Sequence, residues 1–282
     1  NYGSVAPIVY DFTNGKKYVC DITNPSIAKV QLEPSATTRK LLLASQDPSL
    51  IRSVTSLQQR NFVNYSLAAN QGNFLIISHP ALTLGAGGSN PVEEYRAYRS
   101  SAAGGGHSAK IYMVDDILDQ FGFGIKKNPL GMRNFIRFAR KTFSGTPEKN
   151  VLLIGKGLNY IQYRYNESNS NVEALSFIPT FGHPASDILL AADPGLDEIP
   201  KVSIGRISAI NAGEVSVYLA KVMQYEQQQA FQSPLIADKA WMKNVVHVVG
   251  ASDASLGAIL QADMDKYTRI ISDTLYGGNV NT

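Results

Sequence analysis

The sequence predicts an α/β fold, a parallel sheet flanked by helices and preceded by a β-rich N-terminal segment. From residue 71 onward, apolar runs of strand length alternate with amphipathic helical patterns, which is typical of a parallel sheet covered on both faces. Before that point, short β-like runs are separated by turn residues. We therefore expect a leader segment at 1–70 and an α/β part at 71–282.

The leader is expected to form short strands near residues 6–11, 17–22, 30–32 and 39–44. Thr13, Asn14 and Gly15 separate the first two runs, and an Asn-Gly pair is a strong signal for a tight turn between antiparallel strands. Pro34 and Pro48 interrupt the later runs. The leader holds seven basic and four acidic side chains, so it carries the whole net charge of +3.

The α/β part is expected to contain parallel strands at residues 74–78, 109–114, 151–154, 202–206 and 245–249. Helical periodicity predicts helices at 91–102, 129–142, 212–230 and 256–275. Asn90 and Asn128 each precede a proline at a first-turn position, so both are predicted N-caps. Ligand sites in such sheets lie beyond the carboxyl ends of the strands. The functional edge is therefore expected at the loops that begin with His79, Asp115, Gly155, Ile207 and Gly250.

Composition narrows the class of protein. The hydrophobic content of 44% gives no indication of disorder, and a single cysteine excludes a disulfide framework and a cysteine-rich zinc site. No apolar run approaches the roughly 18 residues of a membrane span. The net charge of +3 is too small to indicate nucleic-acid binding by itself.

Two glycine-rich segments match nucleotide-binding loops only in part. The run 85–88 would need a glycine at position 90 to complete G-x-G-x-x-G, and the chain has Asn90 there. Gly155, Lys156 and Gly157 lack the upstream glycine and the Ser or Thr after the lysine that a phosphate loop requires. Ordinary strand-to-loop turns are the better interpretation, and a nucleotide-binding α/β enzyme is the alternative.

The stretch 126–149 holds seven cations against one anion, Glu148. Such a face would suit nucleic acid, but no aromatic stacking platform is interleaved with the cations. A solvated helix face, or one covered by a partner segment, is the better interpretation. We therefore expect no nucleic-acid partner.

Histidine and cysteine give no catalytic pattern. The four histidines show no metal-ligand spacing; they are His79, His107, His183 and His247. A nucleophilic thiol needs a base within hydrogen-bond reach, and no histidine lies near Cys20 in the sequence. We interpret Cys20 as a small buried hydrophobic residue.

One loop is a candidate calcium site. It gathers four carboxylates, whose hard oxygen atoms suit calcium: Asp187, Asp193, Asp197 and Glu198. The ligand order of an EF-hand is absent. No cofactor is expected to be required, and calcium is the one candidate.

Several segments of the α/β part, in order and spacing, resemble the peptidase domain of the gingipain-type cysteine peptidases. The similarity covers about residues 70–276. It rests on FLIISHP at 74–80, YRAYRS at 95–100, DILDQFGFGI at 116–125, MRNF at 132–135 and VLLIG at 151–155. Shorter matches follow, namely IPT at 178–180, SD at 186–187, IGRI at 204–207 and YE at 225–226.

The resemblance implies a caspase-like fold with two α/β halves side by side. It also implies a catalytic dyad, a histidine followed by a cysteine, that belongs to the second half. No histidine of this chain occupies the dyad position, and Cys20 lies upstream of the domain. The chain is therefore expected to be the first half of a peptidase domain, truncated before the dyad and inactive alone, with the second half as its partner.

The leader is similar to that of the sortase branch of the type IX secretion system. The resemblance thus implies an exported protein in the periplasm, in the outer membrane or at the cell surface of a Gram-negative bacterium. Its substrates would be proteins or peptides, cleaved at C-terminal sorting signals. The alternative is a catalytically dead surface or scaffold protein that keeps the domain.

The resemblance also assigns two acidic residues. Asp253 falls where family members carry an acid near the catalytic histidine, which it would orient. Asp263 falls where arginine-specific members place an acid in the substrate pocket, where it would pair with a guanidinium. The alternatives are a helix cap for Asp253 and a solvated helix position for Asp263. Lys156 replaces an acidic residue that often follows the strand at 151–154 in the family.

Overall fold

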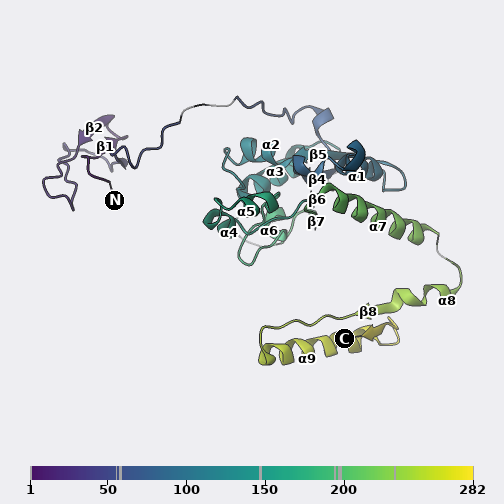
Figure 1. Ribbon diagram of the computed structural model, residues 1–282. Coiled ribbons are helices and arrows are strands. Elements are labelled where there is room, and N and C mark those ends of the chain that lie inside the picture. Colours follow the sequence, from purple (N-terminus) through teal and green to yellow (C-terminus); the bar gives the residue numbers. More distant parts are fainter. Residues whose placement is uncertain are drawn as a thin grey trace. The chain divides into compact units, whose positions relative to one another are not determined.

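The computed structural model describes residues 2–54, 56, 59–145, 148–193, 195, 199–231 and 233–281. The chain divides into two compact units, Asn1–Asn61 and Phe62–Thr282. Figure 1 labels most of the helices and strands of both. In the part of the chain that is described, no helix is long and apolar enough to span a lipid bilayer.

The first unit is a small antiparallel sheet, which confirms the predicted β-rich segment. Its strands are β1 (Ile8–Asp11), β2 (Lys16–Val19) and β3 (Leu41–Ala44), in the order β2-β1-β3. The predicted turn after β1 contains Gly15 at a φ of 64°, a left-handed conformation that glycine adopts without strain. The central strand β1 is largely buried, whereas β2 and β3 are mostly exposed.

The second unit contains the predicted parallel sheet. Its strands are β4 (Phe74–Ser78), β5 (Ala109–Met113), β6 (Asn150–Ile154) and β7 (Ser203–Ile207), in the order β5-β4-β6-β7. All three pairings are parallel, and Phe74 of β4 lies opposite both Ala109 of β5 and Asn150 of β6. Four predicted strands are thus confirmed to within a residue at either end.

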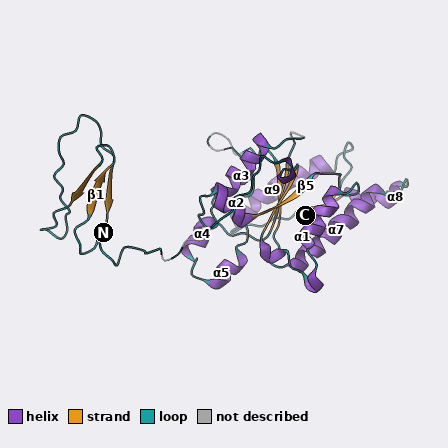
Figure 2. Cartoon of the chain, turned by 90° about the horizontal axis from the view of Figure 1, so that it is seen from above, coloured by secondary structure: helices purple, strands orange, loops and turns teal. Residues whose placement is uncertain are grey.

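Nine α-helices are described. They are α1 (Pro91–Ser100), α2 (Val114–Phe121), α3 (Pro129–Thr142), α4 (Tyr160–Tyr165), α5 (Ser170–Leu175), α6 (Ile188–Ala191), α7 (Ala212–Ala230), α8 (Ile236–Lys239) and α9 (Ala254–Ile271). Short 3-10 turns complete the list: η1 (Ala68–Asn70), η2 (Pro80–Leu82), η3 (Ala86–Gly88) and η4 (Ala240–Lys243). Figure 2 shows α2 and α3 on one side of the main sheet and α1 and α7 on the other.

The predicted N-caps are present. The side chain of Asn90 accepts a hydrogen bond from the backbone N–H of Glu93, and that of Asn128 accepts one from Leu130. Each asparagine thereby satisfies one of the free N–H groups that begin a helix. α3 and α7 have the bounds that their periodicity predicts.

The strand expected at 245–249 is not part of the main sheet. β8 (Asn244–Val246) pairs in parallel with β9 (Asn279–Asn281), and α9 connects the two. Val246 is 70% exposed, Val248 is 86% exposed, and no residue of α9 is buried. The prediction was wrong about this strand because an apolar run indicates a strand without saying which sheet it joins.

A cluster of aromatic rings forms one face of the core. Tyr65 lies 5.4 Å from Phe135 and 6.0 Å from Tyr112, measured between ring centroids. Burial raises the pKa of Tyr65 to about 12. Tyr65 precedes β4 in the chain and belongs to the second unit, so the segment before the sheet contributes to its core.

Candidate functional site

The loops at the carboxyl edge of the main sheet bring charged groups together. His79 follows β4 directly, and Asp115 lies in the first turn of α2, just after β5. The Nε2 atom of His79 lies 4.0 Å from Oδ2 of Asp115. Its Nδ1 atom accepts a hydrogen bond of 3.2 Å from the backbone N–H of Ala81, and its ring lies 5.0 Å from that of Phe177.

A buried lysine lies near His79. Lys127 is 3% exposed and adopts a φ of 54°, and its Nζ donates to the carbonyl oxygen of Phe177 at 3.4 Å. Burial lowers the pKa of Lys127, because a charged ammonium is poorly solvated there. Burial also lowers the pKa of His79, and the positive charge of Lys127 lowers it further.

Glu173 of α5 faces the same group of side chains. It accepts a hydrogen bond of 2.8 Å from the hydroxyl of Tyr163 and forms a salt bridge of 3.0 Å with Lys126. Burial acts to raise the pKa of Glu173, but the bonds from Tyr163 and Lys126 outweigh it and leave the pKa lowered. Glu173 and Lys126 are thus charged partners.

Arg206 lies on β7, an outer strand of the main sheet, and links two loops at this edge. Its guanidinium makes two hydrogen bonds to Asp187, of 2.7 and 2.8 Å. The same group donates to the carbonyl oxygens of Gly155 at 2.7 Å and Ile178 at 3.0 Å. Because its side chain is only 9% exposed, Arg206 ties the loop after β6 to the loop before α6 in a water-poor setting.

Gly155 permits this close approach. Its φ is 143°, a conformation that other residues rarely adopt. A Cβ atom at this position would lie 3.0 Å from Cβ of Phe177 and 3.2 Å from Cδ1 of Leu82. Packing therefore explains Gly155, in agreement with the strand-to-loop turn that the sequence predicts here.

The acidic residues of the candidate calcium loop have arginine partners. Asp187 binds Arg206, and Asp193 accepts two hydrogen bonds of 2.7 Å from Arg140. The bond from Arg140 lowers the pKa of Asp193. Asp197 and Glu198 lie outside the described residues. Among the residues that are described, no three His, Cys, Asp or Glu side chains converge as metal ligands, and the calcium site stays a prediction.

The structure places Asp253 at the start of α9. Its Oδ1 accepts a hydrogen bond of 2.9 Å from the backbone N–H of Leu256, and its Oδ2 accepts one of 3.1 Å from Ser252. The bond from Leu256 lowers the pKa of Asp253. Asp253 is thus an N-cap, and in the described part of the chain it has no histidine partner.

Asp263 lies ten residues further along, on α9. Its carboxylate forms a salt bridge of 2.8 Å with Lys266, and its side chain is 46% exposed. The structure does not bring Asp253 and Asp263 together with the group around His79 in any described interaction. The roles that the family resemblance implies for them, orienting a catalytic histidine and binding a substrate arginine, remain predictions.

Cys20 is buried in the first unit. Its exposed fraction is 5%, and its backbone N–H donates to Pro7. The four histidines all follow residue 61 in the sequence, so the unit that holds the thiol has no imidazole. Cys20 therefore has no imidazole partner within its own unit.

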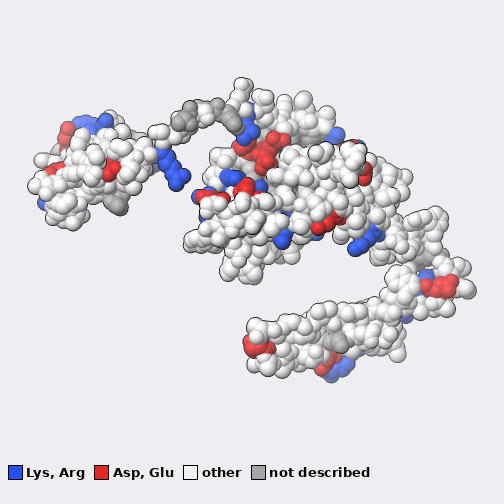
Figure 3. Space-filling view, viewed as in Figure 1, with Lys and Arg blue, Asp and Glu red and all other residues white. Residues whose placement is uncertain are grey.

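The cations of the stretch 126–149 are partly neutralised. Lys126 pairs with Glu173, Arg137 and Arg140 both lie within 4 Å of Asp193, and Lys127 is buried. Figure 3 shows blue and red side chains interspersed on the visible face of the α/β unit. This stretch is thus not a uniformly cationic surface.

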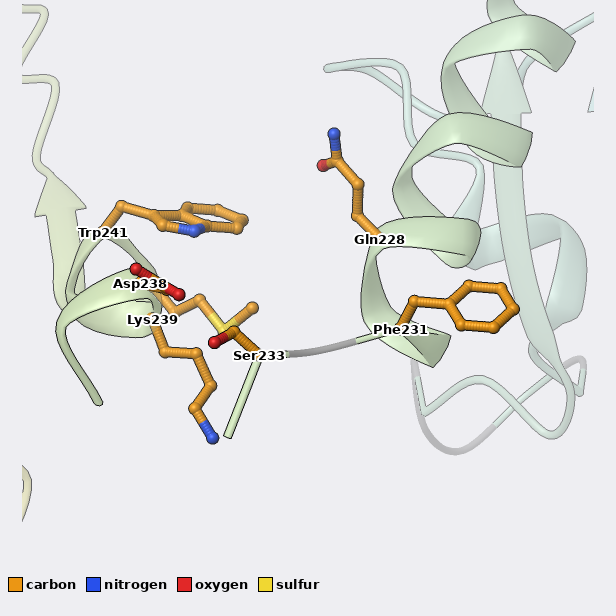
Figure 4. A pocket seen from close by; sticks show the side chains of 7 residues that line it. Gln228, Phe231, Ser233, Asp238, Lys239 and Trp241 are labelled. Carbon is orange, nitrogen blue, oxygen red and sulfur yellow. The ribbon is translucent and has the colours of Figure 1, made fainter. Parts of the chain in front are cut away.

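A hollow of about 460 Å³ lies beyond the end of α7. Figure 4 shows the side chains around it; they belong to Gln228, Phe231, Ser233, Asp238, Lys239, Trp241 and Met242. Neither histidine nor cysteine lines this hollow, so its described lining holds no pair of thiol and imidazole.

Sequence reasoning identified His79 and Asp115 as loop starts at the functional edge, and the structure brings them within ion-pair distance. It missed Lys127 and Glu173. Nothing local in the sequence marks Lys127 as buried, since it lies in a run of basic residues that suggests a solvated face.

Comparison with known protein families shows which family the chain resembles. A family model described as Peptidase family C25 matches residues 67–280. The match covers the main sheet with its helices, and also β8, α9 and nearly all of β9. No curated protein and no solved structure gives a significant match.

Proposed function

Because this chain belongs to peptidase family C25, the gingipain family of cysteine peptidases, we propose that it forms the supporting, non-catalytic half of such a peptidase. The observation that carries the proposal is the family match over residues 67–280 on a chain whose single thiol is buried outside the matched region. The substrates of a peptidase are proteins or peptides, so this half would help to position a polypeptide.

A cysteine peptidase needs a thiolate and an imidazole within hydrogen-bond reach of each other. Cys20 does not meet this requirement within its unit, because it is 5% exposed and the unit has no histidine. We therefore assign neither the nucleophile nor its base to residues of this chain.

The reaction itself would follow thioester chemistry. The thiolate attacks the carbonyl carbon of a peptide bond, the amine leaves with a proton from the imidazole, and a thioester remains. Water or an amine then attacks the thioester and releases the thiolate. In the sortase role that we propose, the peptide bond lies near a C-terminal sorting signal, and export to the cell envelope follows from that role.

A thiol-directed probe tests whether this chain lacks the reacting pair. The full chain and its Cys20→Ser variant are incubated with peptidyl chloromethyl ketones that carry arginine or lysine, and adducts are located by mass spectrometry. We expect no peptide-dependent adduct on Cys20 and no hydrolysis of fluorogenic peptides by either protein. Hydrolysis that is abolished in Cys20→Ser would overturn the assignment.

A second measurement addresses Asp263 as a substrate-pocket residue. If its carboxylate pairs with an arginine side chain, Asp263→Asn weakens the binding of an arginine peptide to the chain by at least tenfold, as expected for a lost charged hydrogen-bond pair of about 1.5–3 kcal/mol. Asp265→Asn is the matched control, since Asp265 lies on the same helix and accepts a hydrogen bond from Gln261. Equal binding by both variants would leave Asp263 as a surface residue.

Calcium at the loop that contains Asp187 and Asp193 is also a proposal, supported by the carboxylates there. Titration of the chain with CaCl2, followed by its melting temperature, tests it. A rise that Asp193→Asn abolishes supports the site, and an unchanged melting temperature contradicts it.

A further inference from the structure

His79 makes two contacts that respond in opposite ways to protonation of its ring. Its Nδ1 accepts a hydrogen bond from the backbone N–H of Ala81, which requires a free lone pair on that nitrogen. Its Nε2 lies 4.0 Å from a carboxylate oxygen of Asp115, a contact that becomes an ion pair only when the imidazole is charged. A protonated imidazole has a proton on both nitrogens, so it cannot keep the bond from Ala81.

The Ala81 bond holds the turn that follows the central strand. His79 is the N-cap of η2, whose last residue, Leu82, is fully buried. Leu82 lies close to Gly155, the residue that follows β6 and binds Arg206. The turn therefore packs against another loop of the same sheet edge, and a change in its cap reaches that loop through direct contact.

Charged groups from three other segments face His79. Asp115 extends from α2, Lys127 from the loop between α2 and α3, and Glu173 from α5. The two carboxylates favour the charged imidazole, and Lys127 opposes it. The ring also lies on Phe177, whose apolar surface favours the neutral form.

From this geometry we propose that His79 is a proton-operated latch. The neutral imidazole caps the turn after β4, and the protonated imidazole releases Ala81 and pairs with Asp115. Acidification thus loosens η2 and its packing against the loop at Gly155. This device is independent of the proposed peptidase role, because it uses only groups of this chain.

Burial of His79 and the charge of Lys127 together determine the pH range in which the imidazole becomes protonated. Together they lower the pKa of His79 below its usual value of about 6.5, so the imidazole is neutral at pH 7. The hydrogen bond from Ala81 to His79 is therefore present at neutral pH and is lost only under acid conditions.

Nuclear magnetic resonance of the full chain tests the latch. The side chain of His79 and the backbone amide of Ala81 are followed from pH 7.5 to pH 4.5 in a selectively labelled sample. We expect the Ala81 amide resonance to titrate with the midpoint of the His79 ring, and the ring to change from the Nε2–H tautomer to the charged form. An Ala81 resonance that stays constant while His79 titrates overturns the proposal.

Substitutions distinguish the effect of His79 protonation on the Ala81 amide from other effects of low pH. His79→Asn keeps a side-chain oxygen that can accept from Ala81 but does not titrate, so the response of the Ala81 amide is lost. Asp115→Asn removes the ionic partner, so the midpoint moves to lower pH. His107→Asn is the control, because His107 lies against Phe74 at the opposite end of β4, and it leaves the Ala81 response unchanged. A response that persists in His79→Asn contradicts the latch.

A measurement on the unmodified chain avoids dependence on variant folding. Amide hydrogen exchange at Ala81, corrected for the intrinsic pH dependence of exchange, is compared at pH 7 and below the midpoint. Loss of one hydrogen bond is expected to reduce protection about fivefold. Equal protection at both pH values overturns the proposal.

Discussion

Arg206 shows how one side chain can fix several loops. It joins the carboxylate of Asp187 to three backbone carbonyl groups and is almost fully buried. Arg206→Ala is expected to lower the free energy of unfolding by about 3 kcal/mol, because it leaves a carboxylate and three carbonyl groups without their donor. Urea unfolding measures the change.

Arg164→Ala is the matched control for Arg206→Ala. Arg164 also binds a carboxylate, that of Glu167 at 2.7 Å, but both side chains are about half exposed. Such surface pairs contribute roughly 0–1 kcal/mol. A loss for Arg206→Ala no larger than that for Arg164→Ala would contradict the role assigned to Arg206.

Asp47 links stability of the first unit to pH. Its carboxylate accepts hydrogen bonds from the backbone and hydroxyl of both Ser4 and Ser49. The bonds from Ser49 and Ser4 hold its pKa well below the ordinary value of 3.8. A depressed carboxyl pKa stabilises the folded state above pH 3.8, and this contribution is lost as the pH falls toward the folded-state pKa.

We therefore expect residues 1–61 to lose protection against hydrogen exchange below about pH 4. Asp47→Asn should weaken this protection at pH 7 and flatten its dependence on acid. A variant with the same acid response as the unmodified chain would show that another group controls it.

Single residues were predictable where the signal is local. Asn90 and Asn128 act as caps through N–H groups two or three residues away, so the sequence alone predicts them. The partners of Asp187 and Asp193 come from β7 and α3, which lie elsewhere in the chain. The clustered acidic residues predicted a calcium site from the sequence. Only the folded structure shows that arginine side chains bind Asp187 and Asp193.

The length of a helix decided whether the sequence could predict it. α3 and α7 are long enough to display helical periodicity, and their bounds match the prediction. α4, α5 and α6 have four to six residues, too few to repeat an apolar pattern. Asn159 and Asn169 cap α4 and α5, and α6 packs against α3 and β7.

The central strand β4 should carry a large part of the stability of the α/β unit. Ile76 is fully buried between two neighbouring strands. Ile76→Ala is expected to lower the free energy of unfolding by about 3 kcal/mol, through lost apolar contact and the cavity that remains. Urea unfolding followed by circular dichroism measures it.

Ile259→Ala is the control for this substitution. Ile259 lies on α9 and is 59% exposed, so the same change in side chain should alter the free energy of unfolding by less than about 0.5 kcal/mol. Similar losses at both positions would mean that α9 is packed more tightly than its exposure indicates.

For the whole molecule, the division into two units predicts a site of cleavage. Every described residue from 48 to 62 is exposed, and none lies in a helix or strand. Limited trypsin treatment is expected to cut first at Arg52 or Arg60 and to leave an α/β fragment with an unchanged melting temperature. A double variant, Arg52→Gln with Arg60→Gln, should resist this first cut. Earlier cleavage within the α/β unit would contradict the division.

The fold class and the positions of the main strands along the chain were predictable because a parallel sheet leaves a repeated pattern along the sequence. The sheet that a given strand joins was not predictable, because strand pairing depends on neighbours that are distant in the sequence. Val245 lies in an apolar run typical of a buried strand, yet it pairs with Val280 of β9. The family resemblance, which covers about residues 70–276, is confirmed by the family match over residues 67–280.

The central position of β4 also affects the order of events during synthesis. β4 pairs with β6, whose first residue, Asn150, follows Phe74 by 76 positions. At roughly 5–20 residues per second, a ribosome needs about 4–15 seconds to make this intervening length. Throughout that interval Leu75, Ile76 and Ile77 lack their second neighbouring strand, so this apolar surface stays exposed to chaperones and to other nascent chains until β6 has been made.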